Sequence, residues 1–152
     1  MVANAGTAFI VATTAYTAND VVGGLAKCVS GTNGGLWIHS IKVLDKANQK
    51  EPYIIHIYRS APTVIADHAA FAPADADGVL ELGTVTVNAV DYATANGSAY
   101  AVAYLRALEH PDVGIPIPES CAGTIYVYLE CTDTPDYVAT SDLEIEMFFW
   151  ID

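Results

Sequence analysis

The sequence of residues 142–152, DLEIEMFFWID, alternates apolar and acidic side chains over most of its length. The apolar members of this alternation are Leu143, Ile145, Met147, Phe149 and Ile151. Because successive side chains of a β-strand point to opposite faces, the period of two predicts a strand with one buried face. On the other face Phe148 and Trp150 replace the carboxylates, so we expect a second layer or a neighbouring subunit to cover that end.

Four more segments predict strands. Residues 124–131, TIYVYLEC, repeat the alternation. Residues 36–44 and 53–58 are rich in β-branched and aromatic side chains, which favour strands. The polar segment 45–52 joins these two, so they are predicted to form a hairpin with a long tip. Residues 83–90 alternate apolar with polar side chains and predict a further strand.

The stretch 99–108 fits two structures. Its apolar side chains line either one face of a helix or one face of a strand, and the preceding hairpin-type pair Asn96-Gly97 favours the strand. Prolines confine residues 113–118 to an extended edge or a loop. Residues 61–82 contain prolines, acids and many alanines, and are predicted to be mainly loop.

The segments together give seven to eight short strands with long loops and no amphipathic helix of normal length. This pattern predicts an all-β fold, an antiparallel β-sandwich or jelly roll. The length fits a single domain, 1–152, which buries about two-thirds of its unfolded surface. Residues 1–35 are mostly small and mix polar with apolar types, so they are a candidate extended N-terminal arm.

The composition excludes several classes of protein. Apolar residues make up 53% of the chain and charged residues 16%, whereas disordered chains combine low hydrophobicity with high charge. The net charge of −12 leaves too few cations for phosphate contacts, so neither nucleic acid nor an anionic membrane is an expected partner. No stretch approaches the roughly 18 apolar residues of a membrane span, and a secretory signal is not expected.

The charge is distributed unevenly along the chain. Residues 1–60 hold five basic and three acidic residues, whereas residues 61–152 hold one basic and fifteen acidic residues. One interpretation is a solvated acidic surface. The other is electrostatic register, in which the lysine-bearing part of one copy, with Lys42, Lys46 and Lys50, faces an acidic patch on a neighbour.

Residues that carry chemistry are present without a recognisable arrangement. The cysteines are Cys28, Cys121 and Cys131, and their wide spacing does not predict a zinc site. We expect reduced thiols and assembly in a cytoplasm. The histidines are His39, His56, His68 and His110, and none forms a metal-binding or catalytic spacing. His39 and His56 fall in the predicted hairpin, where they would be able to face each other.

The segment ADADGVLE at residues 74–81 resembles part of a calcium loop. Calcium needs six to eight oxygen ligands, and Asp75 and Asp77 with the following glycine supply only a fragment of that pattern. Turn-forming aspartates are the favoured interpretation. No catalytic, metal-binding or cofactor-binding residue is therefore predicted.

An ordered series of short motifs runs through most of the chain. These motifs are YTANDVVGG at 16–24, IHSIKVLDK at 38–46, APT at 61–63, DHAAF at 67–71, ADAD at 74–77, GTV at 83–85, TPDY at 134–137 and SDL at 141–143. Over residues 16–145 this succession resembles a family of small structural proteins of tailed bacteriophages, some of which are capsid decoration, or cement, proteins. The resemblance implies a protein on the capsid exterior, often a homotrimer, that clamps neighbouring copies of the major capsid protein. It implies no catalytic residue and no cofactor.

The residues agree with such a role, because a decoration subunit needs a stable fold and adhesive surfaces. Aromatic side chains suit the centre of an interface. The candidate interface residues are Trp37, Lys42, Lys46, Lys50, Tyr126, Tyr128, Phe148 and Trp150. One alternative is a carbohydrate-binding or host-adhesion module of a virion that uses Trp37 and Trp150. Another is a small hydrolase or isomerase on a jelly roll, which needs histidines and carboxylates converging in a pocket.

Overall fold

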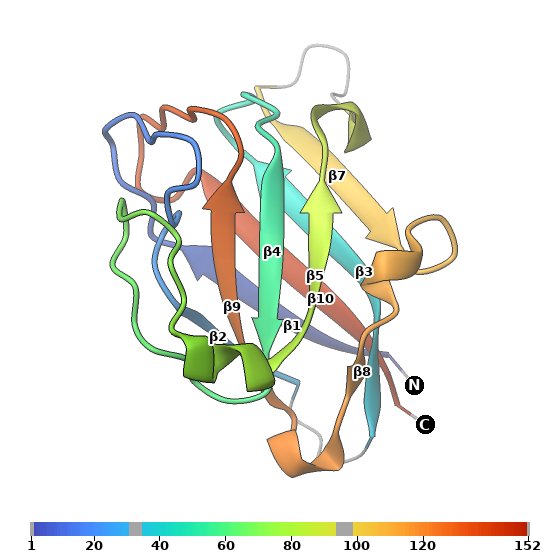
Figure 1. Ribbon diagram of the computed structural model, residues 1–152. Helices are drawn as coiled ribbons and strands as arrows, with labels where there is room; N and C mark the ends of the chain where they lie inside the picture. The colour runs from blue at the N-terminus through green and yellow to red at the C-terminus, as the bar shows by residue number, and fades with distance from the viewer. Residues whose placement is uncertain (1, 31–34, 94–98, 152) are drawn as a thin grey trace.

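Two antiparallel sheets pack face to face in the computed structural model, which describes residues 2–30, 35–93 and 99–151 (Figure 1). The first sheet contains, in spatial order, β1 (Val2–Phe9), β10 (Leu143–Ile151), β3 (Leu36–Asp45), β7 (Ala101–Arg106) and β6 (Tyr92–Ala93), and β8 (Pro116–Ile117) also pairs with β3. The second contains β2 (Ala26–Val29), β9 (Thr124–Cys131), β4 (Tyr53–Tyr58) and β5 (Glu81–Val87). The predicted all-β sandwich is confirmed, and eight of the described strands have four or more residues.

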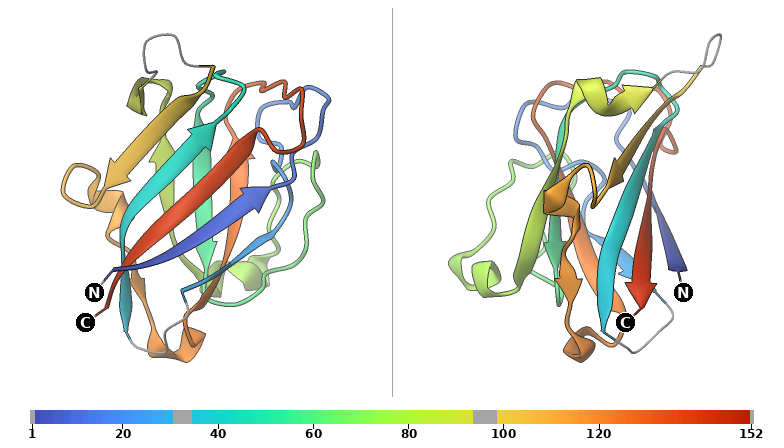
Figure 2. Two further views of the ribbon diagram at one scale, coloured as in Figure 1. Left: turned by 180° about the vertical axis from the view of Figure 1, so that it is seen from behind. Right: turned by 90° about the vertical axis from the view of Figure 1, so that its right-hand side faces the viewer.

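The core lies between the two layers, which the right-hand view of Figure 2 shows side by side. The described side chains that alternate in β10 and β9 point into it and are at most 1% exposed: Leu143, Ile145, Met147, Phe149, Ile125, Val127, Leu129 and Cys131. The side chain of Ile151, predicted to share this face, lies outside the described residues. The period of two therefore identified the buried face of both strands correctly. Short 3-10 helices interrupt the loops, namely η1 (Asp75–Val79), η2 (Ala89–Asp91), η3 (Pro111–Val113) and η4 (Glu119–Cys121).

β3 and β4 belong to different sheets, so the predicted hairpin is wrong. β3 already has β10 on one side and β7 on the other, which leaves no free edge for β4. The buried carboxylate of Asp45 ends β3 by accepting backbone hydrogen bonds from Ala47 (3.0 Å) and Lys50 (2.7 Å). This turn sends the chain to the opposite layer. His39 and His56 consequently lie in opposite sheets and do not face each other.

The candidate N-terminal arm is also corrected by the structure. Within the described part of residues 1–35, β1 pairs antiparallel with β10 along its whole length, and β2 pairs with β9. Both strands are therefore parts of the sandwich. Small side chains gave these segments no clear alternation, but a ladder of backbone hydrogen bonds does not require one.

The stretch 99–108 forms β7, as the strand interpretation predicted, although the pair Asn96-Gly97 lies outside the described residues. Ala101, Ala103 and Leu105 face the core, while Tyr100 and Tyr104 point outward. The proline-rich segment contributes η3 and the short edge strand β8.

Residues 59–80, here called the covering loop, lie over the outer side of the four-stranded sheet. Beneath the loop, Val21, Tyr58 and Tyr128 form a second, smaller core. The backbone N–H of Val21 donates to the carbonyl of Ala69 (2.8 Å), and that of Phe71 donates to the carbonyl of Asn19 (2.7 Å). The four-stranded sheet is thus covered on its outer side as well as its inner one.

Candidate functional site

The outer side of the six-stranded sheet has no covering layer in the described structure, and the left-hand view of Figure 2 shows its strands unobstructed. We call this surface the open face. It consists of Trp37, His39, Lys42, Leu44, Lys46, Tyr100, Val102, Tyr104, Arg106, Leu108, Glu144, Glu146, Phe148 and Trp150, all partly or fully exposed. Among the described residues, every large aromatic side chain that is about half exposed or more lies here, namely Trp37, Tyr100, Tyr104 and Trp150.

One end of the open face is aromatic. Trp37 and Trp150 are direct cross-strand neighbours on β3 and β10, and are 46% and 56% exposed. A β-bulge shifts the register beside Phe148, so that His39 and Ser40 are both partly exposed in succession. The His39 ring consequently reaches Trp150, with the ring centroids 4.7 Å apart. The result is a contiguous aromatic platform.

The other end of the open face is ionic. Lys42 donates to Glu146 at 2.7 Å, and Lys46 donates to Glu144 at 2.5 Å, in both cases across the β3–β10 pair. The hydrogen bond to Glu146 raises the pKa of Lys42, so this ammonium group stays charged at neutral pH. Both lysines are therefore neutralised by acids of the same face.

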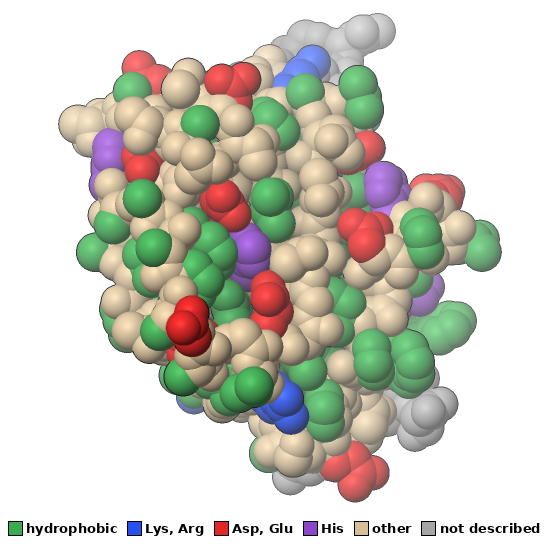
Figure 3. Space-filling model, viewed as in Figure 1, with side chains coloured by type: hydrophobic (Ala, Val, Ile, Leu, Met, Phe, Trp, Pro, Cys, Tyr) green, Lys and Arg blue, Asp and Glu red, His purple; other side chains and the backbone are tan. Residues whose placement is uncertain are grey.

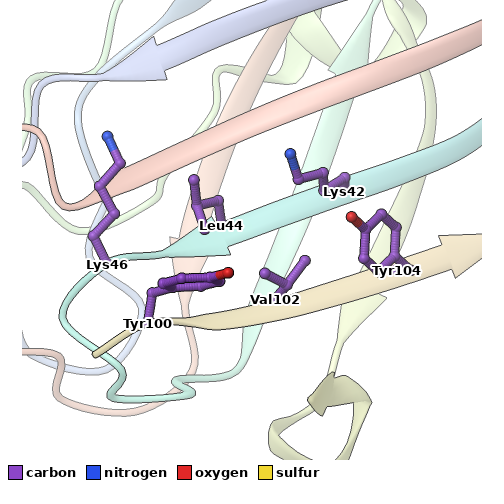
Figure 4. Close-up of a pocket in the computed structure, with 6 residues that line it drawn as sticks. All are labelled: Lys42, Leu44, Lys46, Tyr100, Val102 and Tyr104. Atoms are coloured by element: carbon purple, nitrogen blue, oxygen red, sulfur yellow. The ribbon is translucent and has the colours of Figure 1, made fainter. Parts of the chain in front are cut away.

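A groove runs between β3 and β7 beside these ion pairs. Figure 4 shows Leu44 and Val102 at its floor, with the two lysines on one side and Tyr100 and Tyr104 on the other. Its volume is 410 Å³. The tyrosine hydroxyls and lysine ammonium groups make a polar rim around a small apolar floor. Such a lining suits a partner surface that carries both polar and apolar groups better than a partner surface that is highly charged or fully apolar.

Two further hollows continue this groove toward the aromatic end. One has a volume of 500 Å³ and is lined by His39, Ser40, Tyr104, Arg106, Leu108 and Phe148. The other has a volume of 370 Å³ and adds Trp150 beside His39 and Leu108. Because Tyr104 borders the first two hollows and His39 the last two, a shallow channel follows β3 and β7 along the open face.

The structure brings most of the predicted interface residues together. The five that share the open face are Trp37, Lys42, Lys46, Phe148 and Trp150. Lys50 lies in the connection after β3 and is not part of that face. Tyr126 is only partly exposed and packs against the second core. Tyr128 is fully buried, and the prediction that it is an interface residue is wrong.

The Tyr128 prediction failed because the covering loop occupies the position expected for a partner. The Tyr128 hydroxyl accepts a hydrogen bond from the backbone N–H of Ile65 (2.8 Å) and donates to the carbonyl of Thr63 (3.0 Å). Tyr100, Tyr104 and Arg106 lie on the open face but were not among the predicted interface residues. Their signal was available, because an outward face with the spacing i, i+2, i+4 joins Tyr100, Val102 and Tyr104.

His56 occupies a covered polar cluster on the other sheet. Its Nδ1 lies 3.0 Å from Glu81 and its Nε2 lies 2.9 Å from Glu130, while Phe71 of the covering loop stacks on the ring at 4.0 Å. Figure 3 shows a histidine between acidic side chains at the centre of this face. Both ring nitrogens are engaged, so this histidine offers no free position to a substrate or a metal ion. The cluster is structural, and it seats the covering loop.

The other candidate residues have structural contacts. His68 stacks on Tyr16 at 4.4 Å, and His110 lies 3.9 Å from Asp91. The Asp77 carboxylate accepts backbone hydrogen bonds from Thr63 (3.0 Å) and Ala74 (3.1 Å). These bonds hold the ends of the covering loop. In the described ranges no group of three or more histidine, cysteine or acidic side chains is placed to hold a metal ion.

The three cysteines are buried, and none of them forms a disulfide bond in the described structure. Burial raises the pKa of Cys131 to about 11 and also raises the pKa of Cys121. A nucleophilic cysteine needs the opposite shift, because the thiolate is the reactive form. These two thiols are therefore suited to packing and not to catalysis.

Comparison of the chain with protein-family models gives no match, and neither does comparison with curated protein sequences. Within the described residues, no helix has the length and apolarity needed to cross a membrane.

Proposed function

We propose that the chain is a non-catalytic structural protein of a tailed bacteriophage, which decorates the capsid exterior by docking its open face on the major capsid protein lattice. The observation that carries this proposal is the gathering of the exposed large aromatic side chains of the described structure, each about half exposed, on one side of one sheet. Contiguous exposed apolar patches on soluble proteins commonly mark interaction sites. Outside the open face, the exposed large aliphatic side chains of the described residues are scattered over β2, the loops and the short 3-10 helices.

The open face has the composition of an interface centre. Tryptophan, tyrosine and arginine are the residue types that most often dominate binding energy, and the face contains Trp37, Trp150, Tyr100, Tyr104 and Arg106. Strand spacings give the sheet dimensions of about 20 by 30 Å, or about 600 Å². That area approaches the roughly 800 Å² that each partner buries in a standard interface.

A capsid lattice is the partner that the resemblance to phage decoration proteins implies. Many weak, repeated contacts become strong together on a lattice, so a single modest face is sufficient for stable attachment. A homotrimer would multiply the effect by engaging three sites at once. The net charge of −12 suits an outer surface, because packaged DNA would repel it.

The direct test compares shells assembled without the protein, before and after it is added. Decoration predicts saturable binding, density for the protein over the lattice by electron microscopy, and a higher temperature of shell disruption. Trp150→Ala is expected to weaken binding, whereas Val90→Ala, at an exposed position of η2 outside the open face, is expected to leave it unchanged. Identical disruption temperatures with no lattice density would reject the proposal.

A second candidate is a carbohydrate-binding or host-adhesion module. The adjacent exposed indoles of Trp37 and Trp150 favour it, because aromatic platforms pack against the apolar faces of sugar rings. A glycan array probed with the oligomer separates the two functions. Retention on a neutral glycan that is lost in Trp150→Ala would support the module, and silence across the array would count against it.

A further inference from the structure

We infer that Arg106 is the point at which the open face recognises a carboxylate of its protein partner, an inference that rests on the proposed docking function. Arg106 ends β7 and lines the 500 Å³ hollow together with Tyr104, Leu108 and Phe148. Its side chain is exposed. The ligand that fits is an aspartate or glutamate side chain flanked by an apolar or aromatic group.

The charges of the open face favour a carboxylate ligand at Arg106. The open face carries Lys42, Lys46 and Arg106, and the two lysines already have acidic partners at 2.7 and 2.5 Å. Arg106 has no acidic partner among the described residues, although the chain has 18 acids and only 6 basic residues. The one uncompensated cation of this face is therefore positioned to complement a negative charge supplied from outside.

The geometry of the 500 Å³ hollow also favours a carboxylate ligand. No acid lines the hollow, and the polar groups beside Arg106 in its lining are the Tyr104 hydroxyl, the His39 ring and the Ser40 hydroxyl, of which the last two lie 3.3 Å apart. The backbone carbonyl of Arg106 accepts hydrogen bonds from Glu109 (2.9 Å) and His110 (2.7 Å), so the base of the side chain is held by a tight turn. A guanidinium group on a fixed backbone can meet a carboxylate with two parallel hydrogen bonds.

The side chains around the Arg106 guanidinium would strengthen its ion pair with a docked carboxylate. Tyr104, Phe148 and Leu108 provide apolar walls, so a docked partner would exclude water from the ion pair. Charged hydrogen bonds strengthen when they are desolvated.

The test of carboxylate recognition uses the isolated, isotope-labelled protein and two matched probes, acetyl-phenylalanyl-aspartyl-amide and acetyl-phenylalanyl-asparaginyl-amide. The expected result is a shift of the Arg106 side-chain N–H and the Trp150 indole N–H signals with the aspartyl probe, at an affinity at least fivefold above that for the asparaginyl probe. Arg106→Gln should abolish this preference, Arg106→Lys should reduce it, and Lys50→Gln should preserve it. Equal affinities for the two probes, or no shift with either, would overturn the inference.

Binding to shells then separates this inference from the proposed function. Arg106→Gln is expected to bind shells at least tenfold more weakly than the parent chain, with the difference shrinking at high salt. Shell binding that is unchanged in Arg106→Gln overturns the inference and leaves the proposed function standing. A parent chain that prefers the aspartyl probe but ignores shells overturns the proposed function instead. Retention on polygalacturonate that depends on Arg106, without the aspartyl preference, would assign the site to an acidic glycan and overturn a protein partner.

Discussion

Trp37 on β3 lies directly opposite Trp150 on β10, and each indole is about half exposed at one end of the open face. Their neighbours along the strands, Ile38 and Phe149, are buried and anchor the two strands in the core. Adjacent residues thus have separate roles: Ile38 and Phe149 hold the strands in the core, and Trp37 and Trp150 are presented to solvent. This division allows adhesion to be altered without loss of the fold.

Replacement of either tryptophan should separate binding from stability. Trp37→Ala and Trp150→Ala are each expected to lower the free energy of unfolding by about 1 kcal/mol or less, the size of an exposed cross-strand pair. Each should weaken shell binding at least tenfold, as residues at an interface centre do. Urea denaturation and shell sedimentation measure the two effects, with Val90→Ala as the control. A large stability loss with unchanged binding would contradict this division.

Tyr92 and Tyr128 offer a matched test of buried hydroxyl groups. The Tyr92 hydroxyl is buried without a hydrogen-bond partner in the described structure, whereas that of Tyr128 has two. Tyr92→Phe is expected to leave stability unchanged or to raise it by about 1 kcal/mol, because it removes an unsatisfied polar group. Tyr128→Phe is expected to cost about 1–3 kcal/mol, because it leaves the Ile65 N–H unpaired. Urea denaturation of both variants measures the change in the free energy of unfolding. An equal loss of stability in the two variants would contradict the predicted difference.

The His56 cluster should behave as a unit. His56→Leu removes the group that separates Glu81 from Glu130, and the expected cost is about 2 kcal/mol or more. Combining it with Glu81→Gln and Glu130→Gln should restore at least half of the loss, because the two uncompensated carboxylates are gone. Urea denaturation of the single and combined variants measures the coupling. Strictly additive losses would show that the three side chains act independently.

Stability should decline in alkali. Burial raises the pKa of Cys131 from 9.0 to about 11, and also raises the pKa values of Tyr58 and Tyr137 above the tyrosine value of 10.0. A group with a raised pKa in the folded state stabilises the fold fully below its unfolded value, and loses that contribution as the pH rises through the folded value. The free energy of unfolding should therefore fall above pH 9, between about pH 9 and 11 for Cys131.

Denaturation in urea at pH 7 to 11 measures this decline, and Cys131→Val should make it shallower between pH 9 and 11. The same burial predicts slow reaction of Cys131 with Ellman's reagent at pH 8 until the chain is unfolded. Rapid labelling of Cys131 in the folded protein would contradict the burial described above.

The regular strands could be predicted from the sequence because each has one face in the core. In β9 and β10 the alternation identified every described inward residue, since burial on one face imposes a period of two. The pattern did not indicate which sheet a strand joins. That choice depends on free edges, and β3 has none to offer β4.

The open face was only partly predictable. The alternation placed Phe148 and Trp150 outside the core, but the same reasoning placed Tyr128 on the surface. Whether an outward residue meets solvent or another segment depends on where a long loop packs, and the loop that covers Tyr128 has no regular pattern. The Glu81–His56–Glu130 cluster also remained unpredicted, because its members come from three strands far apart in the chain.

The covering loop has a consequence for assembly. Among the described residues, it leaves exposed large aromatic side chains on one side of the molecule, while residues 59–80 cover the opposite side. A protein with one binding face forms a layer one molecule thick on the surface that it binds. The outer side of that layer offers no binding site for a second layer. Growth on a surface would stop by itself once every site is occupied, with no separate signal to end it.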